Sequence, residues 1–125
     1  MPSQQVLDQF IARVLENAHV EAIEEFYAPD ATMRENQDPP RRGRDALVAH
    51  ERRVLARAGS VRSTCVRPVF VVDDHVVIRW VFDFEWQDGS RTRIEELAYQ
   101  TWRDDKIVEE TFFYDPAQRA PIQPA

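Results

Sequence analysis

Glu35 is one of the few residues whose type and surroundings suit proton transfer. At strand spacing it shares a face with Ala31 and Met33, two apolar residues of a short predicted strand over 31–36. Burial in an apolar cavity raises the pKa of a carboxyl group toward the range useful for proton transfer near neutral pH. We therefore expect Glu35 to act as a general base. The alternative is a solvated glutamate, or one paired with a nearby arginine: Arg34, Arg41 or Arg42.

His50 and Glu51 are adjacent on a predicted helix that begins at Gly43 and ends near Ala58. At about 100° per residue, Glu51 falls within the apolar stripe of this helix and His50 on its flank. A carboxylate among apolar side chains needs a partner or a cavity. His50 is therefore a second catalytic candidate, which would polarise or orient a substrate. Alternatively, Glu51 pairs with an arginine of the sheet and His50 is half exposed.

Other chemistries have little support in the sequence. His19, His50 and His75 lack metal-ligand spacing, and the three glycines stand alone rather than in a phosphate-binding loop. We expect no metal and no cofactor. The net charge of −6 argues against nucleic acid as a partner. We see no signal peptide and no apolar run long enough to span a membrane, and we expect a cytoplasmic protein.

Hydrophobic periodicity predicts helices first and strands afterwards. Apolar residues at helical spacing predict helices over 3–17, 20–27 and 43–58, with the short strand 31–36 before the third helix. Alternation then predicts four strands joined by tight turns: 61–72, 76–86, 91–103 and 107–114. Segregated helices and an antiparallel meander make an α+β domain. We expect one domain over 1–125, with a core over about 4–116 and an extended tail over 117–125.

Four segments carry a family likeness: FYAPDATM at 26–33, GRDAL at 43–47, WRDDKIV at 102–108 and FYDP at 113–116. In their order and spacing they resemble the nuclear transport factor 2-like superfamily, which includes SnoaL-like polyketide cyclases and ketosteroid isomerases. The resemblance covers the chain from about Val6 to Pro116. It implies a cone-shaped, strongly bent antiparallel sheet wrapped over three N-terminal helices, with a cavity inside.

The resemblance also assigns positions, one residue at a time. Glu35 falls where the isomerases have their general base. Ile11 and Ala98 fall where they have the phenol and the protonated aspartate that stabilise the enolate. Because these two donors are missing, we do not expect steroid isomerisation by the usual mechanism. Phe112 falls where limonene epoxide hydrolases have an aspartate, so their acid–base set is incomplete as well.

By the same resemblance, one face of each long strand is the concave face. Each residue that we expect to contact a ligand lies on such a face, or beside Glu35 on the short strand. They are Met33, Trp80, Phe82, Phe84, Glu96, Gln100, Trp102, Phe112 and Tyr114. Whether Glu51 and Glu110 point into the cavity or are paired stays open. A register slip of one residue would exchange the two faces.

Three functions remain open. The first is a cofactor-free isomerase, cyclase or dehydratase that acts on a small, mostly apolar carbonyl compound, with Glu35 as base. The second is a binding protein that uses the same cavity without turnover. The third is a structural or partner-binding module. We also expect a homodimer through the outer face of the sheet, because Val77, Leu97 and Tyr99 leave that face apolar.

Overall fold

The computed structural model describes residues 1–124. Three helices, six strands and one short 3-10 helix follow one another along the chain. In chain order they are α1 (Gln4–Leu15), α2 (His19–Phe26), β1 (Tyr27–Glu35), β2 (Arg41–Arg42), α3 (Arg44–Arg57), β3 (Ala58–Val72), β4 (His75–Trp86), β5 (Arg91–Arg103), β6 (Lys106–Phe113) and η1 (Pro116–Arg119). The predicted helices and the four long strands are confirmed within a few residues at each end. The α+β class is confirmed as well.

The strands form one sheet in the order β2-β1-β6-β5-β4-β3. Strands β3 to β6 are an antiparallel meander, but β1 pairs with β6 in parallel. The sheet is therefore mixed rather than wholly antiparallel. This pairing was not predicted, because β1 and β6 are joined by most of the chain and no turn between them sets their direction.

Strand β1 starts at Tyr27, four residues before the strand predicted from the sequence. The prediction places Pro29 in the break that ends the second helix, with the strand beginning after it. The register between β1 and β6 shifts between Tyr27 and Thr32, so Pro29 lies where the regular pairing is interrupted. The proline is thus accommodated inside a strand.

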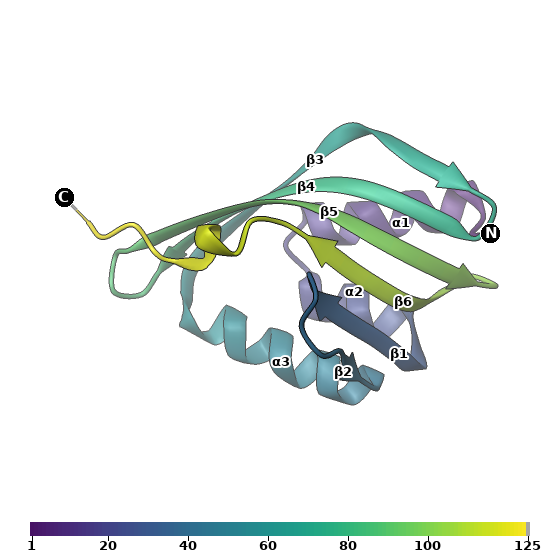
Figure 1. Cartoon of the computed structure of the whole chain (residues 1–125), viewed down its shortest axis with the longest axis horizontal. Helices are drawn as coiled ribbons and strands as arrows, with labels where there is room; N and C mark the ends of the chain where they lie inside the picture. The colour runs from purple at the N-terminus through teal and green to yellow at the C-terminus, as the bar shows by residue number, and fades with distance from the viewer. Residues whose placement is uncertain (125) are drawn as a thin grey trace.

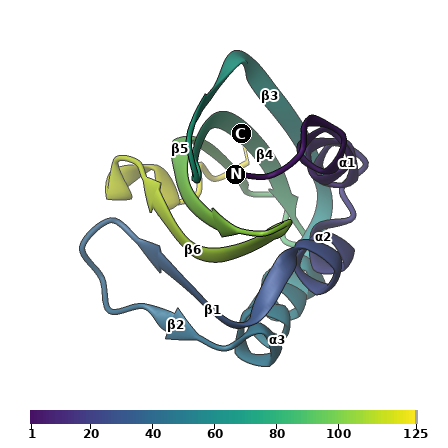
Figure 2. The same ribbon diagram turned by 90° about the vertical axis from the view of Figure 1, so that its right-hand side faces the viewer.

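The sheet is strongly curved and wraps round the helices. Figure 2 shows β3, β4, β5 and β6 bending around α1 and α2, while α3 lies beside β1 and β2. Register shifts interrupt β3 between Val66 and Phe70, and the β5–β6 pairing between Thr101 and Trp102. Such irregularities increase local bending and twist. The result is a cone whose long strands extend past the helices (Figure 1).

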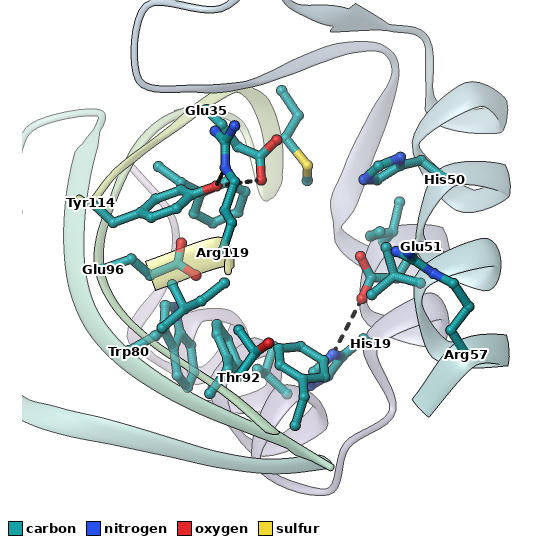
Figure 3. Close-up of a pocket in the computed structure, with 18 of the residues that line it drawn as sticks. His19, Glu35, His50, Glu51, Arg57, Trp80, Thr92, Glu96, Tyr114 and Arg119 are labelled. Atoms are coloured by element: carbon teal, nitrogen blue, oxygen red, sulfur yellow. Dashed lines mark hydrogen bonds and ion pairs between the residues drawn. The ribbon is translucent and has the colours of Figure 1, made fainter. Parts of the chain in front are cut away.

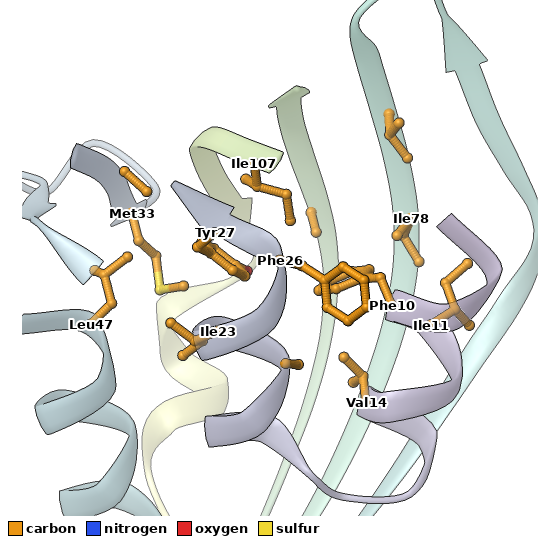
Figure 4. Close-up of a cluster of buried hydrophobic side chains, with 14 of the residues drawn as sticks. Phe10, Ile11, Val14, Ile23, Phe26, Tyr27, Met33, Leu47, Ile78 and Ile107 are labelled. Atoms are coloured by element: carbon orange, nitrogen blue, oxygen red, sulfur yellow. The ribbon is translucent and has the colours of Figure 1, made fainter. Parts of the chain in front are cut away.

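The hydrophobic core fills the end of the cone where α1 and α2 lie against the sheet (Figure 4). Phe10 lies at its centre, with edge-on ring contacts to Phe26 at 5.6 Å and Trp102 at 5.9 Å. Ile78 and Ile107 of the sheet are fully buried beside them. Because α1 and α2 cover only part of the sheet, they do not fill the other end of the cone.

The chain after β6 is folded back rather than extended. Asp115 caps η1 by accepting a hydrogen bond from the backbone N–H of Ala117 at 2.9 Å. Further on, Ile122 and Arg91 exchange two backbone hydrogen bonds of 2.7 and 2.9 Å. The expected extended tail is therefore wrong over 117–119, where the chain forms η1, whereas Ala120 is extended and Ile122 is bridged to β5. The partner of Ile122 lies about 30 residues away, so the local pattern does not reveal it; residue 125 of the expected tail lies outside the described residues. Over residues 1–124, no helix is both long and apolar enough to cross a membrane.

Candidate functional site

A cavity of about 810 Å³ occupies the open part of the cone. Its floor is formed by Phe10, Val14 and Ile23, and its mouth by Gln87, Asp88 and Pro121. Most of the predicted site residues line it: Met33, Glu35, His50, Trp80, Phe82, Phe84, Glu96, Phe112 and Tyr114. Cavities of roughly 300–1,000 Å³ are typical of small-molecule sites.

Gln100 and Trp102 do not line the cavity, although their strand and face were predicted correctly. Both are fully buried in the core. The indole N–H of Trp102 donates to Gln100 Oε1 at 3.0 Å, and Gln100 Nε2 donates to Glu110 Oε2 at 2.7 Å. Their positions along β5 place them under α1 and α2, beyond the floor of the cavity. We correct the expectation that they contact a ligand.

Strand β4 supplies a row of aromatic rings along one wall. Trp80 stacks on Phe82 with a centroid distance of 5.6 Å, and Phe84 stacks on Trp86 at 4.9 Å with the rings parallel to within 1°. Alternate residues of a strand face the same side, so one strand can present all four rings. At the mouth, the guanidinium group of Arg57 lies 5.4 Å from the centre of the Trp86 ring. The wall suits a flat, apolar ligand.

Glu35 is half-buried and both of its carboxyl oxygens have partners. The hydroxyl of Tyr114 donates to Glu35 Oε1 at 2.9 Å, and Arg41 Nη1 lies 3.3 Å from Oε2. Pairing with Arg41 is one of the alternatives left open by the sequence. Tyr114 also accepts a hydrogen bond from Arg119 Nε at 2.6 Å. Burial raises the pKa of Tyr114 to about 12, so it remains a phenol that donates to Glu35.

His50 faces the cavity from α3, on the side opposite Glu35 (Figure 3). Within the part of the chain that the structure describes, its ring makes no hydrogen bond. Burial lowers the pKa of His50, and the charge of Arg41 acts in the same direction. His50 is therefore a neutral imidazole near pH 7, with ring nitrogens available to a ligand.

Glu51 lines the cavity and is also paired, but with a histidine of α2 rather than with the expected arginine of the sheet. Its Oε1 lies 3.4 Å from Nδ1 of His19, and Nε2 of His19 lies 2.8 Å from Ser63 Oγ. His19 was not predicted as a site residue. It begins α2 beside apolar residues, and only the packing of α2 against α3 brings it to Glu51.

Glu96 is the most unusual group in the cavity wall. It is only 9% exposed, and its Oε2 is buried without a hydrogen-bond partner in residues 1–124. Burial raises the pKa of Glu96 well above its ordinary value, and the nearby carboxyl groups of Glu110, Glu35 and Glu51 raise it further. The sequence identified its face, but not its depth in the cone or its lack of a partner.

Glu110 is buried, lines the cavity and is paired. It accepts hydrogen bonds from the hydroxyl of Tyr27 and from Gln100 Nε2. Burial raises the pKa of Glu110 to about 7, although both hydrogen bonds act in the opposite direction. Over residues 1–124, no three His, Cys, Asp or Glu side chains are arranged to hold a metal. The site can thus hold an apolar molecule among several acidic groups and one free imidazole.

The curved sheet over three helices is the fold of nuclear transport factor 2-like proteins, and its hollow end defines a small α+β protein with an internal cavity. A SnoaL-like domain profile matches residues 7–110. The chain belongs to the SnoaL-like family. No curated protein sequence matches it.

Solved structures of low sequence identity share the fold. A protein from Mesorhizobium loti assigned to the SnoaL-like polyketide cyclases is 21% identical, with a TM-score of 0.76 over 91% of this chain and 100% of that one. A nuclear transport factor 2-like protein of unknown function from Burkholderia pseudomallei is 12% identical, with a TM-score of 0.77 over 92% of each chain. A protein with a ketosteroid isomerase-like fold from Catenulispora acidiphila, in complex with trimethylamine, is 16% identical, with a TM-score of 0.75 over 94% of this chain and 90% of that one.

Proposed function

We propose that the protein binds a small, mostly apolar molecule in the cone cavity and, without a cofactor, moves a proton on it. The reaction class is that of an isomerase, cyclase or dehydratase, in which a base removes a proton from a carbon beside a carbonyl group. Glu35 is the base in this proposal, and His50 polarises or orients the substrate. The complex of the Catenulispora acidiphila neighbour with trimethylamine supports small-molecule binding as a use of the fold.

The observation that carries the proposal is that Glu35 and His50 line the same cavity from facing walls (Figure 3). A general base must come within hydrogen-bond reach of the proton that it removes. A ligand between β1 and α3 would contact the carboxylate on one side and the imidazole on the other. Tyr114 and Arg41 hold the two carboxyl oxygens in place, which orients Glu35 before a ligand enters.

The pairing of Glu35 with Arg41 also favours a second function, binding without turnover. A carboxyl oxygen held by an arginine can accept a proton from a ligand only after that contact is displaced. In that case the cavity would bind its ligand and the two polar residues would only orient it.

Deuterium exchange separates the two functions without knowledge of the natural substrate. The flat ketone β-tetralone is incubated with the protein in D₂O, and loss of the protons beside its carbonyl group is followed by NMR. We expect the wild type to accelerate exchange over buffer, and Glu35→Gln to lose most of the acceleration, because the amide cannot accept the proton. General-base catalysis typically contributes about 100- to 10,000-fold, so the loss should be large.

Glu85→Gln is the matched control, because Glu85 is exposed on the outer side of β4. It should exchange the ketone protons at the wild-type rate. Chemical shift changes of cavity residues on addition of the ketone report binding independently. Binding without accelerated exchange would favour the second function. Equal acceleration by Glu35→Gln and the wild type would remove Glu35 from the mechanism.

A further inference from the structure

Resting on the proposed function, we propose that the ligand carries a basic nitrogen, and that this ammonium group binds between Glu96 and Trp80. The site would therefore select a small organic cation with an apolar body. This goes beyond an apolar cavity, because it names the charged group of the ligand and the place where it binds. Three observations support the proposal.

The first observation is an unpartnered carboxyl oxygen. Glu96 is deeply buried in the cavity wall, and its Oε2 has no hydrogen-bond partner in residues 1–124. Buried polar atoms in proteins are nearly always paired, and leaving one unpaired costs about 1–3 kcal/mol. A ligand that donates a hydrogen bond to this oxygen would remove that cost. An ammonium group donates up to three.

The second observation is the residue beside Glu96. Trp80 of β4 stands directly opposite Glu96 of β5 in the antiparallel register, so the two side chains are neighbours on the concave face. Both lie on the same wall in Figure 3. The face of an indole ring attracts a cation more strongly than that of any other side chain. A carboxyl group and an indole side by side form a two-part ammonium site.

The third observation is the distribution of charge. The groups with the largest charge effects on Glu96 are three carboxyl groups from three elements: Glu110 of β6, Glu35 of β1 and Glu51 of α3. Each arginine that lines the cavity already has a partner. Arg41 pairs with Glu35, Arg119 pairs with Asp38, and Arg57 lies over Trp86. A cation entering this end of the cavity would therefore lie among acidic groups that can ionise to balance its charge.

Binding of the ammonium group is coupled to the loss of one proton from Glu96. Burial and the neighbouring carboxyl groups raise the pKa of Glu96 and so favour its protonated form in the empty cavity. Binding of an ammonium group at Glu96 would then release that proton. The proton passes to solvent, and a carboxylate–ammonium pair forms beside the indole. The imidazole of His50, which faces the same cavity, gains no proton in this step, because a cationic ligand disfavours a second positive charge. A neutral carbonyl ligand would instead leave the proton on Glu96 and accept a hydrogen bond from it.

Isothermal titration calorimetry with naphthylmethylamine and naphthylmethanol tests the proposal, because the two probes have nearly the same shape and differ in charge at neutral pH. We expect the amine to bind about tenfold more tightly or better, as a desolvated cation–π contact plus a charged hydrogen bond requires. Titration in phosphate and in Tris, which differ in ionisation heat, should show proton release with the amine and none with the alcohol.

Glu96→Gln keeps the shape and supplies an N–H donor in place of the carboxyl O–H, but it cannot carry a negative charge. We expect it to weaken the amine about tenfold or more and to change the alcohol less than about twofold. Glu95→Gln is the control, because Glu95 faces outward and pairs with Arg79 at 2.8 Å. It should leave both probes unaffected.

Equal binding of the two probes would overturn the inference while the cavity remains a ligand site. Retention of the amine by Glu96→Gln would overturn it as well, even if the proposed function holds. If the alcohol bound more tightly than the amine, and Glu96→Gln bound it equally well, the inference would also be wrong. Glu96 would then be a neutral donor to an oxygen of the ligand. Failure of both probes to bind would count against the inference and the proposed function together.

Discussion

Burial of Glu110 links the folding of this protein to pH. The pKa of its carboxyl group rises from an ordinary 4.5 to about 7 in the folded protein. The folded state therefore holds this proton over a pH range in which the unfolded chain has lost it. The stability contributed by the group is complete below about 4.5 and is lost as the pH rises through about 7.

Glu110→Gln mimics the protonated group and should flatten this dependence. Between about pH 5 and about pH 8, we expect the wild type to lose on the order of 1–3 kcal/mol of unfolding free energy relative to the variant. Urea denaturation at both pH values measures it. Glu109→Gln, on the exposed side of the same strand, should behave as the wild type. If the unfolding free energies of Glu110→Gln and the wild type changed equally between the two pH values, Glu110 would already be ionised at the lower one.

Strand β4 contributes side chains to both the core and the cavity wall, because it runs from one to the other. Trp80 lies where the core meets the inner end of the cavity and is only 2% exposed, whereas Phe84 is half-buried on the open part of the cavity. A core side chain leaves a void when it is shortened. A side chain beside an existing cavity creates little new void.

The two truncations should therefore differ in cost. We expect Trp80→Ala to destabilise the protein by about 3–5 kcal/mol and Phe84→Ala by about 1–2 kcal/mol. Chemical denaturation of both variants measures the difference directly. Similar losses for both would place the boundary between core and cavity elsewhere along β4. A loss near zero at Trp80 would contradict the assignment of this face as concave.

For the molecule as a whole, the outer face of the sheet remains to be explained. Leu97, Tyr99 and Phe113 are 45%, 44% and 40% exposed there, on neighbouring strands of the sheet. Contiguous apolar surface on a small protein often marks an interface. We propose that a second copy of the chain covers this face.

Sedimentation at micromolar concentration should show a homodimer, twice the 14.6 kDa mass of the chain. Leu97→Glu should shift the species to the monomer, because two copies related by symmetry would bring the new charges into one apolar interface. Ala12→Glu on α1 places the same charge at an exposed position on the helical side of the protein, away from this patch, and is the control. A 14.6 kDa species alone in the wild type would exclude the dimer at that concentration.

Local patterns in the sequence were enough to predict the helices, the long strands and the residues that share a face. The evidence is apolar residues at helical spacing in 3–17 and strict alternation from Val76 to Trp86. The family likeness, not the alternation, identified the faces that carry Glu35, Glu96 and Glu110 as concave. The family likeness supplied the cone that joins those faces into one cavity.

Tertiary structure decided how deep each residue lies and what it touches. Glu96, Ala98 and Gln100 share one face of β5, yet Glu96 lies in the cavity wall and Gln100 lies in the core beneath the helices. Alternation is the same at each position, so it carries no information about depth along the cone. The parallel pairing of β1 with β6 was also decided at this level. Such contacts join segments far apart in the chain, and burial of a carboxyl group depends on those distant partners rather than on its neighbours in the sequence.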